Sequence, residues 1–436
     1  MRKRLNKVIA TCLTAALTVS VLSACGEKST ESPAAGGEVT IKFGIHVADP
    51  QNQETVTYNI VQAFNEKYAG QYKVEFEAAE KTAHCTNLKL KAADGTMPEL
   101  FWMDSAEAPE YSEGGYLLDL SDFLRQYPSI DQALDDSVKK AFQTDIQYGL
   151  PYQCNVEGFF YNKEVFAEHD IAVPAGGTTY EEFLGMIGKF KEAGVTPVAQ
   201  GSVDAYAVWS FLAVLDRYGY SSYIYDILEG KEKFHNENLI TCFEKLEELG
   251  KAGAFPANMS TLSYFDAKTN FMAGQAALLD TGAWDCAELD SKLGDKVGFW
   301  WGPVFSDSNF EQKIAMKVPS APVGVSKKAA EDEQVKKAVY TFLEFYYGEE
   351  AAKISYAGSA FPATNYTDIE VADTQYALKA VMNALNENWV SPAAQPDQIL
   401  SSAVQTQLYD SMLGVMLGNY TPAEALDKLD QQLSYE

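Results

Sequence analysis

Tryptophans and polar side chains stand directly after several predicted strands. Trp284 follows the apolar run at residues 276–279, and Trp102 and Asp104 follow the start of another apolar run at Leu100. Ligands of open α/β sheets bind at the carboxyl ends of strands. A flat aromatic ring covers the C–H face of a small polar molecule, while carboxylates and amides bond its hydroxyl groups. These residue types predict non-covalent binding of an uncharged polar ligand.

Motifs for covalent or metal chemistry are absent from the sequence. It has no Gly-x-x-x-x-Gly-Lys-Ser/Thr phosphate loop and no Gly-x-Ser-x-Gly nucleophile segment. The histidines lack the spacing of zinc ligands or of a Ser-His pair. We therefore expect no metal site and no cofactor. A pair of catalytic carboxylates remains open among the 61 acidic residues.

The elements that must position these residues alternate between strands and helices. Residues 39–45 and 72–76 have strand patterns, and Val56, Ile60 and Phe64 mark one face of a helix between them. This order predicts an α/β sheet with crossover helices. The same alternation of strands and helices is predicted later in the chain. Its signals are a capping box at Thr179 and Glu182, a strand at 196–199, helices at 234–251 and 335–346, and a last helix that begins after Thr421.

The N-terminus has the pattern of an export signal. Four bases occur among the first seven residues, and an apolar run of Val8 to Leu22 follows. This run is shorter than the roughly 20 residues that a membrane-spanning helix needs. The segment that ends in Cys25 resembles a bacterial lipoprotein signal, which implies cleavage after residue 24 and lipidation of Cys25. A plain secretory signal is the alternative. Residues 25–38 lack large apolar side chains and are expected to form a flexible tether.

Composition and charge exclude several classes of protein. Apolar residues make up 47% of the 436 residues and charged residues 22%, as in soluble globular proteins of more than one domain. The formal charge of −27 and the lack of a basic stripe argue against a nucleic-acid partner.

Four cysteines remain beyond the predicted signal, at positions 85, 154, 242 and 286, with no Cys-x-x-Cys pair. We expect them to be free and buried, although export permits disulfides and the three possible pairings stay open.

Four segments then resemble, in order, those of family 1 extracellular solute-binding proteins, the carbohydrate-binding, maltose-binding-protein-like group of ABC transporters. The resemblance covers nearly all of residues 39–436. The segments are residues 91–101 (KAADGTMPELF), 115–120 (GYLLDL), 149–152 with 160–166 (GLPY and FYNKEVF), and 271–284 (FMAGQAAL to GAW).

The resemblance implies an α/β, two-lobed, periplasmic-binding-protein-like (type II) fold that closes on its ligand by hinge motion. The chain would cross between lobes near residues 153–157, 314–322 and 366–390. Lobe 1 would then comprise residues 39–153 and 319–370, and lobe 2 residues 154–318 and 371–436. A monomer is expected.

The predicted ligand site combines these positions. Trp284 is the first choice, since the resemblance places it on the ligand, and a core position is its alternative. Relatives also have ligand contacts near Asp104, Trp102 and His46, and the first crossover contains Gln153 and Asn155. Further candidates complete the prediction: Trp209, Trp389 and the pair Trp300 and Trp301. Only one of that adjacent pair can face a cleft if both lie in a strand, and we favour Trp301.

The resemblance implies a receptor that captures a sugar and delivers it to the transmembrane subunits of an ABC permease. It would be anchored by lipid on Cys25 at the outer face of the cell membrane, and it would not be an enzyme. Two alternatives remain. One is a receptor for a peptide, an amino-acid derivative or a polyamine. The other is a surface glycosidase that acts through Asp104 and Asp285.

Overall fold

A computed structural model describes residues 37–134, 136–366, 369–392 and 394–435. The predicted signal (residues 1–24), Cys25 and nearly all of the tether lie outside these ranges. Residues 38–436 form one compact unit that contains two β-sheets. No helix within the described ranges is long and apolar enough to span a bilayer.

The first sheet has the strand order β2-β1-β3-β10-β4. Its strands are β1 (Val39–Ile45), β2 (Tyr72–Ala78), β3 (Leu100–Trp102), β4 (Leu150–Pro151) and β10 (Pro322–Val325). β1 runs parallel to both β2 and β3, whereas β10 is antiparallel to β3 and β4. Parallel neighbours need a crossover, and α2 (Thr55–Lys67) supplies it between β1 and β2 with Ile60 and Phe64 buried.

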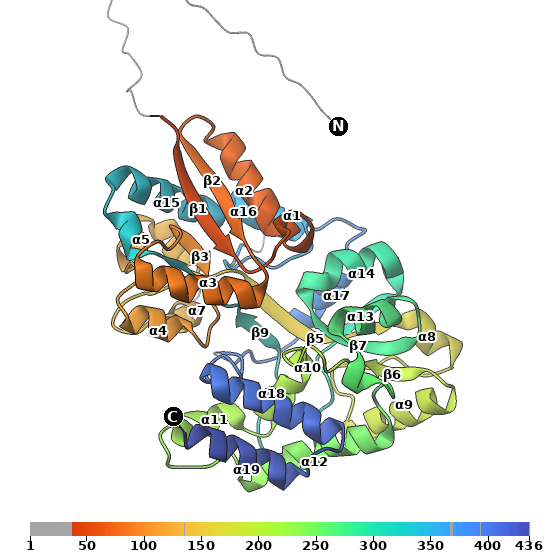
Figure 1. Cartoon of the computed structure of the whole chain (residues 1–436). Helices are drawn as coiled ribbons and strands as arrows, with labels where there is room; N and C mark the ends of the chain where they lie inside the picture. The colour runs from red at the N-terminus through yellow and green to blue at the C-terminus, as the bar shows by residue number, and fades with distance from the viewer. Residues whose placement is uncertain (1–36, 135, 367–368, 393, 436) are drawn as a thin grey trace, which may run out of the picture. The chain divides into compact units, whose positions relative to one another are not determined.

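Helices cover both faces of the first sheet because its strands are apolar on both sides. Leu100 and Trp102 point into one buried cluster, while Phe101 and Met103 point into another. Figure 1 shows α2 and α15 next to β1 and β2, and α16 packs on α2 and α15. Besides α2, the helices of this part are α1 (Pro50–Gln53), α3 (Lys81–Asp94), α4 (Ala108–Glu113), α5 (Ser121–Gln126), α6 (Pro128–Ala133), α7 (Asp136–Lys140), η4 (Lys327–Ala330), α15 (Glu333–Tyr346) and α16 (Glu349–Ala357).

The second sheet has the order β6-β7-β5-β8, and β9 also pairs with β5. Its strands are β5 (Cys154–Asn162), β6 (Thr196–Ala199), β7 (Ala276–Gly282), β8 (Val297–Trp300) and β9 (Met316–Pro319). β6 and β7 are parallel, whereas β5 is antiparallel to β7, β8 and β9. Phe159 and Phe160 point into separate clusters on the two faces.

Helices pack on both faces of the second sheet as well. Those before β8 are α8 (Lys163–Glu168), α9 (Tyr180–Glu192), α10 (Trp209–Arg217), α11 (Tyr220–Leu228), α12 (Glu237–Ala252), η1 (Met259–Thr261), α13 (Tyr264–Met272), η2 (Ala283–Asp285), α14 (Cys286–Leu293) and η3 (Gly294–Lys296). Those after β10 are α17 (Tyr376–Leu385), α18 (Ser402–Met416) and α19 (Pro422–Leu433). The capping box predicted at Thr179 is present, and the last helix begins after Thr421 as predicted, with a capping box of its own.

Three connections join the two sheets and their helices. Strand β4 of the first sheet ends at Pro151, and strand β5 of the second sheet begins at Cys154. β9 ends at Pro319 and pairs with β5, and the chain re-enters the first sheet at β10. A third connection lies between α16 and α17, because α16 packs on α2 while α17 packs on β8. The predicted α/β class with two sheets is thus confirmed.

Candidate functional site

Three aromatic side chains beside the second sheet form a contiguous group. Trp209 begins α10, Tyr264 begins α13, and Trp284 lies in η2 directly after β7. The Trp209 ring centroid lies 4.9 Å from that of Trp284 and 5.0 Å from that of Tyr264, both edge to face. Trp209 and Trp284 remain partly exposed. Large aromatic faces that are held in place and still reach solvent suit a binding surface.

Gly282 provides room for the Trp284 ring. A Cβ atom built at Gly282 would lie 2.2 Å from that ring, which is closer than any van der Waals contact. The Trp284 Nε1 group donates a hydrogen bond to the Tyr264 hydroxyl at 3.3 Å. The ring therefore packs against Gly282 at the end of β7, and its hydrogen bond to Tyr264 fixes its orientation.

Asp285, next to Trp284, is the anchor of this group. Its Oδ1 atom lies 2.9 Å from Lys268 Nζ, and its Oδ2 atom accepts from the hydroxyls of Thr281 and Tyr264. Lys268 and Asp285 are both buried. Burial, followed by the charge of Asp285, raises the pKa of Tyr264 well above its ordinary value. Asp285 is thus fully engaged in holding η2 to α13.

The first sheet presents a second aromatic pair. His46 follows β1, Trp102 ends β3, and their rings stack with centroids 4.2 Å apart. A hydrogen bond fixes the backbone of Trp102, since its carbonyl oxygen lies 2.8 Å from His84 Nε2. Both residues stand at the carboxyl ends of neighbouring parallel strands, as the sequence predicted.

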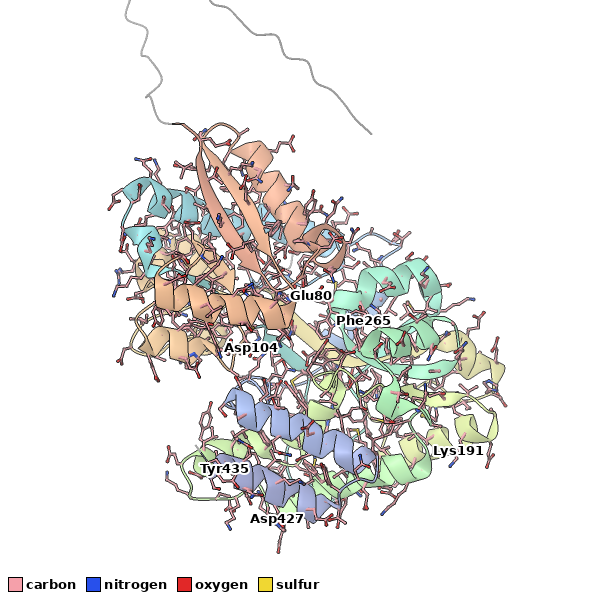
Figure 2. All side chains as sticks on the ribbon, viewed as in Figure 1. Glu80, Asp104, Lys191, Phe265, Asp427 and Tyr435 are labelled. Carbon is pink, nitrogen blue, oxygen red and sulfur yellow. The ribbon has the colours of Figure 1, made fainter. Side chains whose placement is uncertain are left out.

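Asp104 follows β3 and lies beside α3 (Figure 2). Its Oδ2 atom lies 2.9 Å from Nζ of Lys81, the first residue of α3. The same ammonium lies 5.7 Å from the ring centroids of both Trp102 and Tyr206. Tyr206 contacts Trp209 at 5.9 Å, so Lys81 links the residues of the first sheet to the aromatic group.

Glu54 and Tyr152 complete the polar side chains near His46. The Tyr152 hydroxyl donates to Glu54 Oε2 at 3.0 Å and also bonds the hydroxyl of Thr57. Burial raises the pKa of Glu54 to about 7, and the hydrogen bond from Tyr152 offsets part of that rise. Glu54 Oε1 lies 3.6 Å from His46 Nε2.

Of the predicted crossover residues, Gln153 directly precedes β5 and Asn155 lies near its start, on the same face as Glu157. Gln153 Nε2 lies 3.5 Å from Asn155 Oδ1, and Asn155 Nδ2 donates to Glu157 Oε1 at 3.4 Å. Side chains at every second position of a strand share a face. This face therefore continues from the connection between the sheets to the buried Glu157.

Three of the candidate residues, Trp300, Trp301 and Trp389, are not brought to this group. Trp301 is buried on one face of the second sheet, where its indole donates to the carbonyl oxygen of Ala384 at 3.3 Å. Trp300 is buried on the other face and donates to the carbonyl oxygen of Ala175. Trp389 is half-buried against Trp301, 6.0 Å between centroids. The adjacent tryptophans do point to opposite faces, but each of them serves a core.

Several residues in these contacts were missed at the level of sequence. Tyr264 and Lys81 each begin a helix, and Tyr206 lies in the loop before α10. Glu157 is an acid in an otherwise apolar strand, and this pattern alone could have singled it out. Tyr264, Lys81 and Tyr206 come close to the predicted ligand residues only through contacts between segments that are distant in the sequence.

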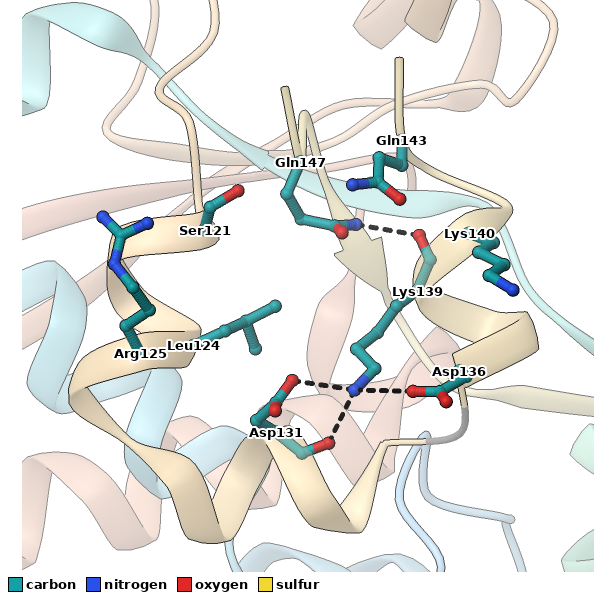
Figure 3. Close-up of a pocket in the computed structure, with 9 residues that line it drawn as sticks. All are labelled: Ser121, Leu124, Arg125, Asp131, Asp136, Lys139, Lys140, Gln143 and Gln147. Atoms are coloured by element: carbon teal, nitrogen blue, oxygen red, sulfur yellow. Dashed lines mark hydrogen bonds and ion pairs between the residues drawn. The ribbon is translucent and has the colours of Figure 1, made fainter. Parts of the chain in front are cut away.

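A cavity of about 420 Å³ lies elsewhere, beside α5, α6 and α7. Figure 3 shows that Lys139 there is bound by both Asp131 and Asp136. The cation is therefore already neutralised by its neighbours, and none of the predicted ligand residues lines this cavity.

The described part of the chain contains no group of three or more His, Cys, Asp or Glu side chains that could hold a metal ion. Cys85, Cys242 and Cys286 are free thiols. Cys242 and Cys286 are buried as predicted, whereas Cys85 is only half-buried. Burial raises the pKa of Cys242 above its ordinary range, so this thiol stays protonated and unreactive.

Sequence comparison gives a family and a relative. The family model for bacterial extracellular solute-binding proteins matches residues 59–380. The multiple sugar-binding protein of Streptococcus mutans serotype c (strain ATCC 700610 / UA159) is 22% identical over 285 residues, which span 62% of each chain.

Solved structures share the fold across nearly the whole chain. One comes from a study of xylan utilisation by the thermophilic bacterium Caldanaerobius polysaccharolyticus. It has a TM-score of 0.77 and 23% identity over 90% of this chain and 99% of that one. Another is a chitin oligosaccharide binding protein, with a TM-score of 0.75 and 23% identity over 90% and 98% of the two chains. At these identities the similarity establishes the fold alone.

Proposed function

This chain belongs to the family of bacterial extracellular solute-binding proteins, and from that premise we propose that it captures a carbohydrate for an ABC importer. The observation that carries the proposal is the aromatic group of Trp209, Tyr264 and Trp284, in which both tryptophans are partly exposed. It is linked through Lys81 to the stacked pair of His46 and Trp102. The curated relative, which is named for binding several sugars, also supports it.

The arrangement fits a sugar in two respects. Rings of Trp209 and Trp284 offer apolar area to the C–H faces of a pyranose. Carboxylate and amide groups of Asp104, Gln153 and Asn155 offer hydrogen bonds to its hydroxyls. Aromatic area together with a few aligned polar groups is how proteins bind neutral polar rings.

Capture would couple to closure of two lobes. We assign residues 39–153 and 319–370 to lobe 1 and residues 154–318 and 371–436 to lobe 2, with β5 and β9 as adjacent connections. Closure brings groups from both lobes onto one ligand, and the transmembrane subunits of the permease would recognise the closed form. We further propose that Cys25 is lipidated and holds the receptor, as a monomer, at the outer face of the cell membrane.

The chain is proposed to bind its ligand without chemical change. A glycosidase would need Asp104 and Asp285 as acid and nucleophile or base, with one carboxylate able to reach the scissile bond. Asp285 instead is buried and bonded to Lys268, Thr281 and Tyr264. This occupation of both its oxygens argues against a catalytic role.

A thermal-shift panel of sugars on residues 26–436 tests the proposal. A ligand at a hundredfold excess over its Kd stabilises the folded form by about 2.7 kcal/mol. The expected result is a rise in Tm with one class of sugar, followed by recovery of that sugar intact. Release of shorter sugars at catalytic rates, or a rise in Tm with peptides alone, would contradict it.

A further inference from the structure

Three buried carboxyl groups gather beside the proposed sugar site. Glu157 lies on β5, Asp280 on β7 and Asp397 in the segment before α18, and their exposed fractions are 1%, 2% and 6%. Each has one oxygen without a hydrogen-bond partner among the residues that the structure describes: Glu157 Oε2, Asp280 Oδ2 and Asp397 Oδ1. A buried acceptor without a partner costs free energy, so this arrangement requires an explanation.

Glu157 and Asp280 are neighbours in the second sheet, and the charge of Asp397 acts on Glu157. Glu157 pairs with Gly282 across the β5–β7 ladder, so Asp280 is its diagonal neighbour on the same face. Burial, then the charges of Asp397 and Asp280, raises the pKa of Glu157 well above its ordinary value. Burial also raises the pKa of Asp280 to about 7 and that of Asp397 to about 6.

The protein supplies only neutral partners to these groups. Asn155 donates to Glu157, the backbone and hydroxyl of Ser210 donate to Asp280, and the Tyr409 hydroxyl donates to Asp397. Over the described ranges, no ion pair includes any of the three carboxylates.

The one fully buried guanidinium in the described core is committed elsewhere. Arg217 donates to the carbonyl oxygens of Gln312, Trp301 and Ile314. The three carboxyl groups therefore have no cation paired with them among the described residues, although the charge of Lys81, which is paired with Asp104, acts on Asp397.

The carboxyl cluster is continuous with the proposed sugar site. Glu157 ends the polar face that contains Gln153 and Asn155. Ser210, which holds Asp280, directly follows Trp209 in α10. The charges of Asp104 and Lys81 reach Asp397. A ligand between Trp209 and Asp104 would thus meet these carboxyl oxygens next.

The missing counter-charge matches an ammonium group better than a metal ion. A bound Ca²⁺ or Mg²⁺ needs oxygens within about 2.0–2.6 Å, and no described carboxylates gather that closely. An ammonium group has three N–H donors, each of which reaches an oxygen about 2.8 Å away.

We propose that Glu157, Asp280 and Asp397 receive a primary ammonium group of the ligand through their three unpartnered oxygens. The inference rests on the proposed function, and together they name the ligand as an amino sugar or an oligosaccharide that contains one. The neutral remainder of the sugar lies against the aromatic group.

Matched pairs of sugars test the inference by calorimetry and thermal shift on residues 26–436 near neutral pH. Chitosan oligosaccharides and cello-oligosaccharides of equal length have the same sugar ring and the same linkage. The chitosan oligosaccharide has a primary amine at the position where the cello-oligosaccharide has a hydroxyl. Glucosamine, galactosamine and mannosamine are each compared with their neutral parent sugar, and spermidine is added as an amine without a sugar. The expected result is binding of an amino sugar at least about tenfold tighter than its neutral partner, as for a hydrogen bond to a charged group.

Isosteric variants locate the preference. Glu157→Gln and Asp397→Asn should each reduce the preference for the amino sugar about tenfold and leave affinity for the neutral partner nearly unchanged. Asp216→Asn is the control. Asp216 has a buried oxygen without a described partner, as the three cluster residues do, but its other oxygen accepts a hydrogen bond from Ser221 and it is not a member of the cluster. Circular dichroism of each variant confirms its fold. Two independent variants keep the test decisive if one of them fails to fold.

The outcomes separate this inference from the proposed function. If neutral sugars bind as tightly as amino sugars, or if no amine-bearing probe binds, the ammonium site is refuted, and a response to neutral sugars leaves the sugar receptor standing. If spermidine alone binds, and Glu157→Gln abolishes that binding, the ammonium site stands and the sugar receptor falls. If Asp216→Asn alters the preference as much as Glu157→Gln does, the preference does not arise at this cluster.

Discussion

The imidazole ring of His46 lies nearly parallel to the indole ring of Trp102, with an angle of 22° between the planes. Burial lowers the pKa of His46 to about 3, and the positive charges of His84 and Lys81 add to the effect. The His46 ring is therefore neutral at physiological pH. Its Nδ1 atom is buried and has no partner among the described residues, and we propose that a ligand hydroxyl bonds it.

His46→Phe should weaken sugar binding about tenfold while the stack on Trp102 is kept, because one neutral hydrogen bond is lost. Titrations at several pH values between about 5 and 8 measure it. The variant and the parent protein should have parallel pH profiles, because His46 is already neutral throughout that range. A pH profile that flattens only in the variant would show that His46 titrates there.

Trp284→Ala should reduce sugar affinity by about 2 kcal/mol or more, as for other central aromatic contacts, and leave folding nearly intact. The reason is that Trp284 is partly exposed and contacts mainly Trp209 and Tyr264. Calorimetry and urea unfolding separate the two effects. Tyr225→Ala, at an exposed tyrosine of α11, is the matched control and should change neither. An unfolded Trp284→Ala protein would assign this residue to the core.

Gly282→Ala tests whether the orientation of Trp284 matters for binding. The added methyl group would overlap the indole ring, so the ring must turn away and sugar affinity should fall by a similar factor to that of Trp284→Ala. Gly185→Ala in α9 is the control, since nothing lies within 4 Å of its new Cβ. That control should stabilise the protein by about 0.5–1 kcal/mol and leave binding unchanged. Equal affinities for Gly282→Ala and the parent would show that the ring is not a contact surface.

The position of Trp284 was predictable because the signal is local. An apolar strand and then Gly-Ala-Trp place a side chain at a strand end whatever the rest of the chain does. Asp104 was located by the same rule and His46 by the resemblance to relatives, and the two-sheet α/β class followed from the alternation of strands and helices. The capping boxes at Thr179 and Thr421 also depend on neighbours only three residues away.

Trp301 and Lys81 show what such rules miss. Nothing in the sequence near Trp301 indicates that this residue is buried. In the structure, α17 comes from a distant segment and packs on β8, so that it covers the face of the second sheet on which Trp301 lies. Lys81 looks like a solvated base, yet it bridges Asp104 and Tyr206, which is 125 positions away. The sequence also favoured an uncharged ligand, because the cluster of Glu157, Asp280 and Asp397 forms only when three distant segments meet.

Asp280 should make stability depend on pH. Its pKa in the folded protein is about 7 and thus above the value of about 4 expected in the unfolded chain. The folded state therefore binds more protons between those values, and stability falls as pH rises from about 4 to 7. Asp280→Asn should remove this loss and raise the free energy of unfolding at pH 8 by on the order of 2–4 kcal/mol. Urea unfolding at pH 4 and pH 8 measures it, and an equal effect at both would contradict the assignment.

Lys268→Met should destabilise the protein by about 3–5 kcal/mol, because it leaves Asp285 buried without its cation. Sugar affinity should fall as well, since Asp285 fixes Tyr264 and η2, on which Trp284 lies. Glu288→Gln is the control, because Glu288 contacts the same ammonium from a half-exposed position and such pairs contribute at most about 1 kcal/mol. If both variants lose the same small stability, the pair of Lys268 and Asp285 is not what holds this site together.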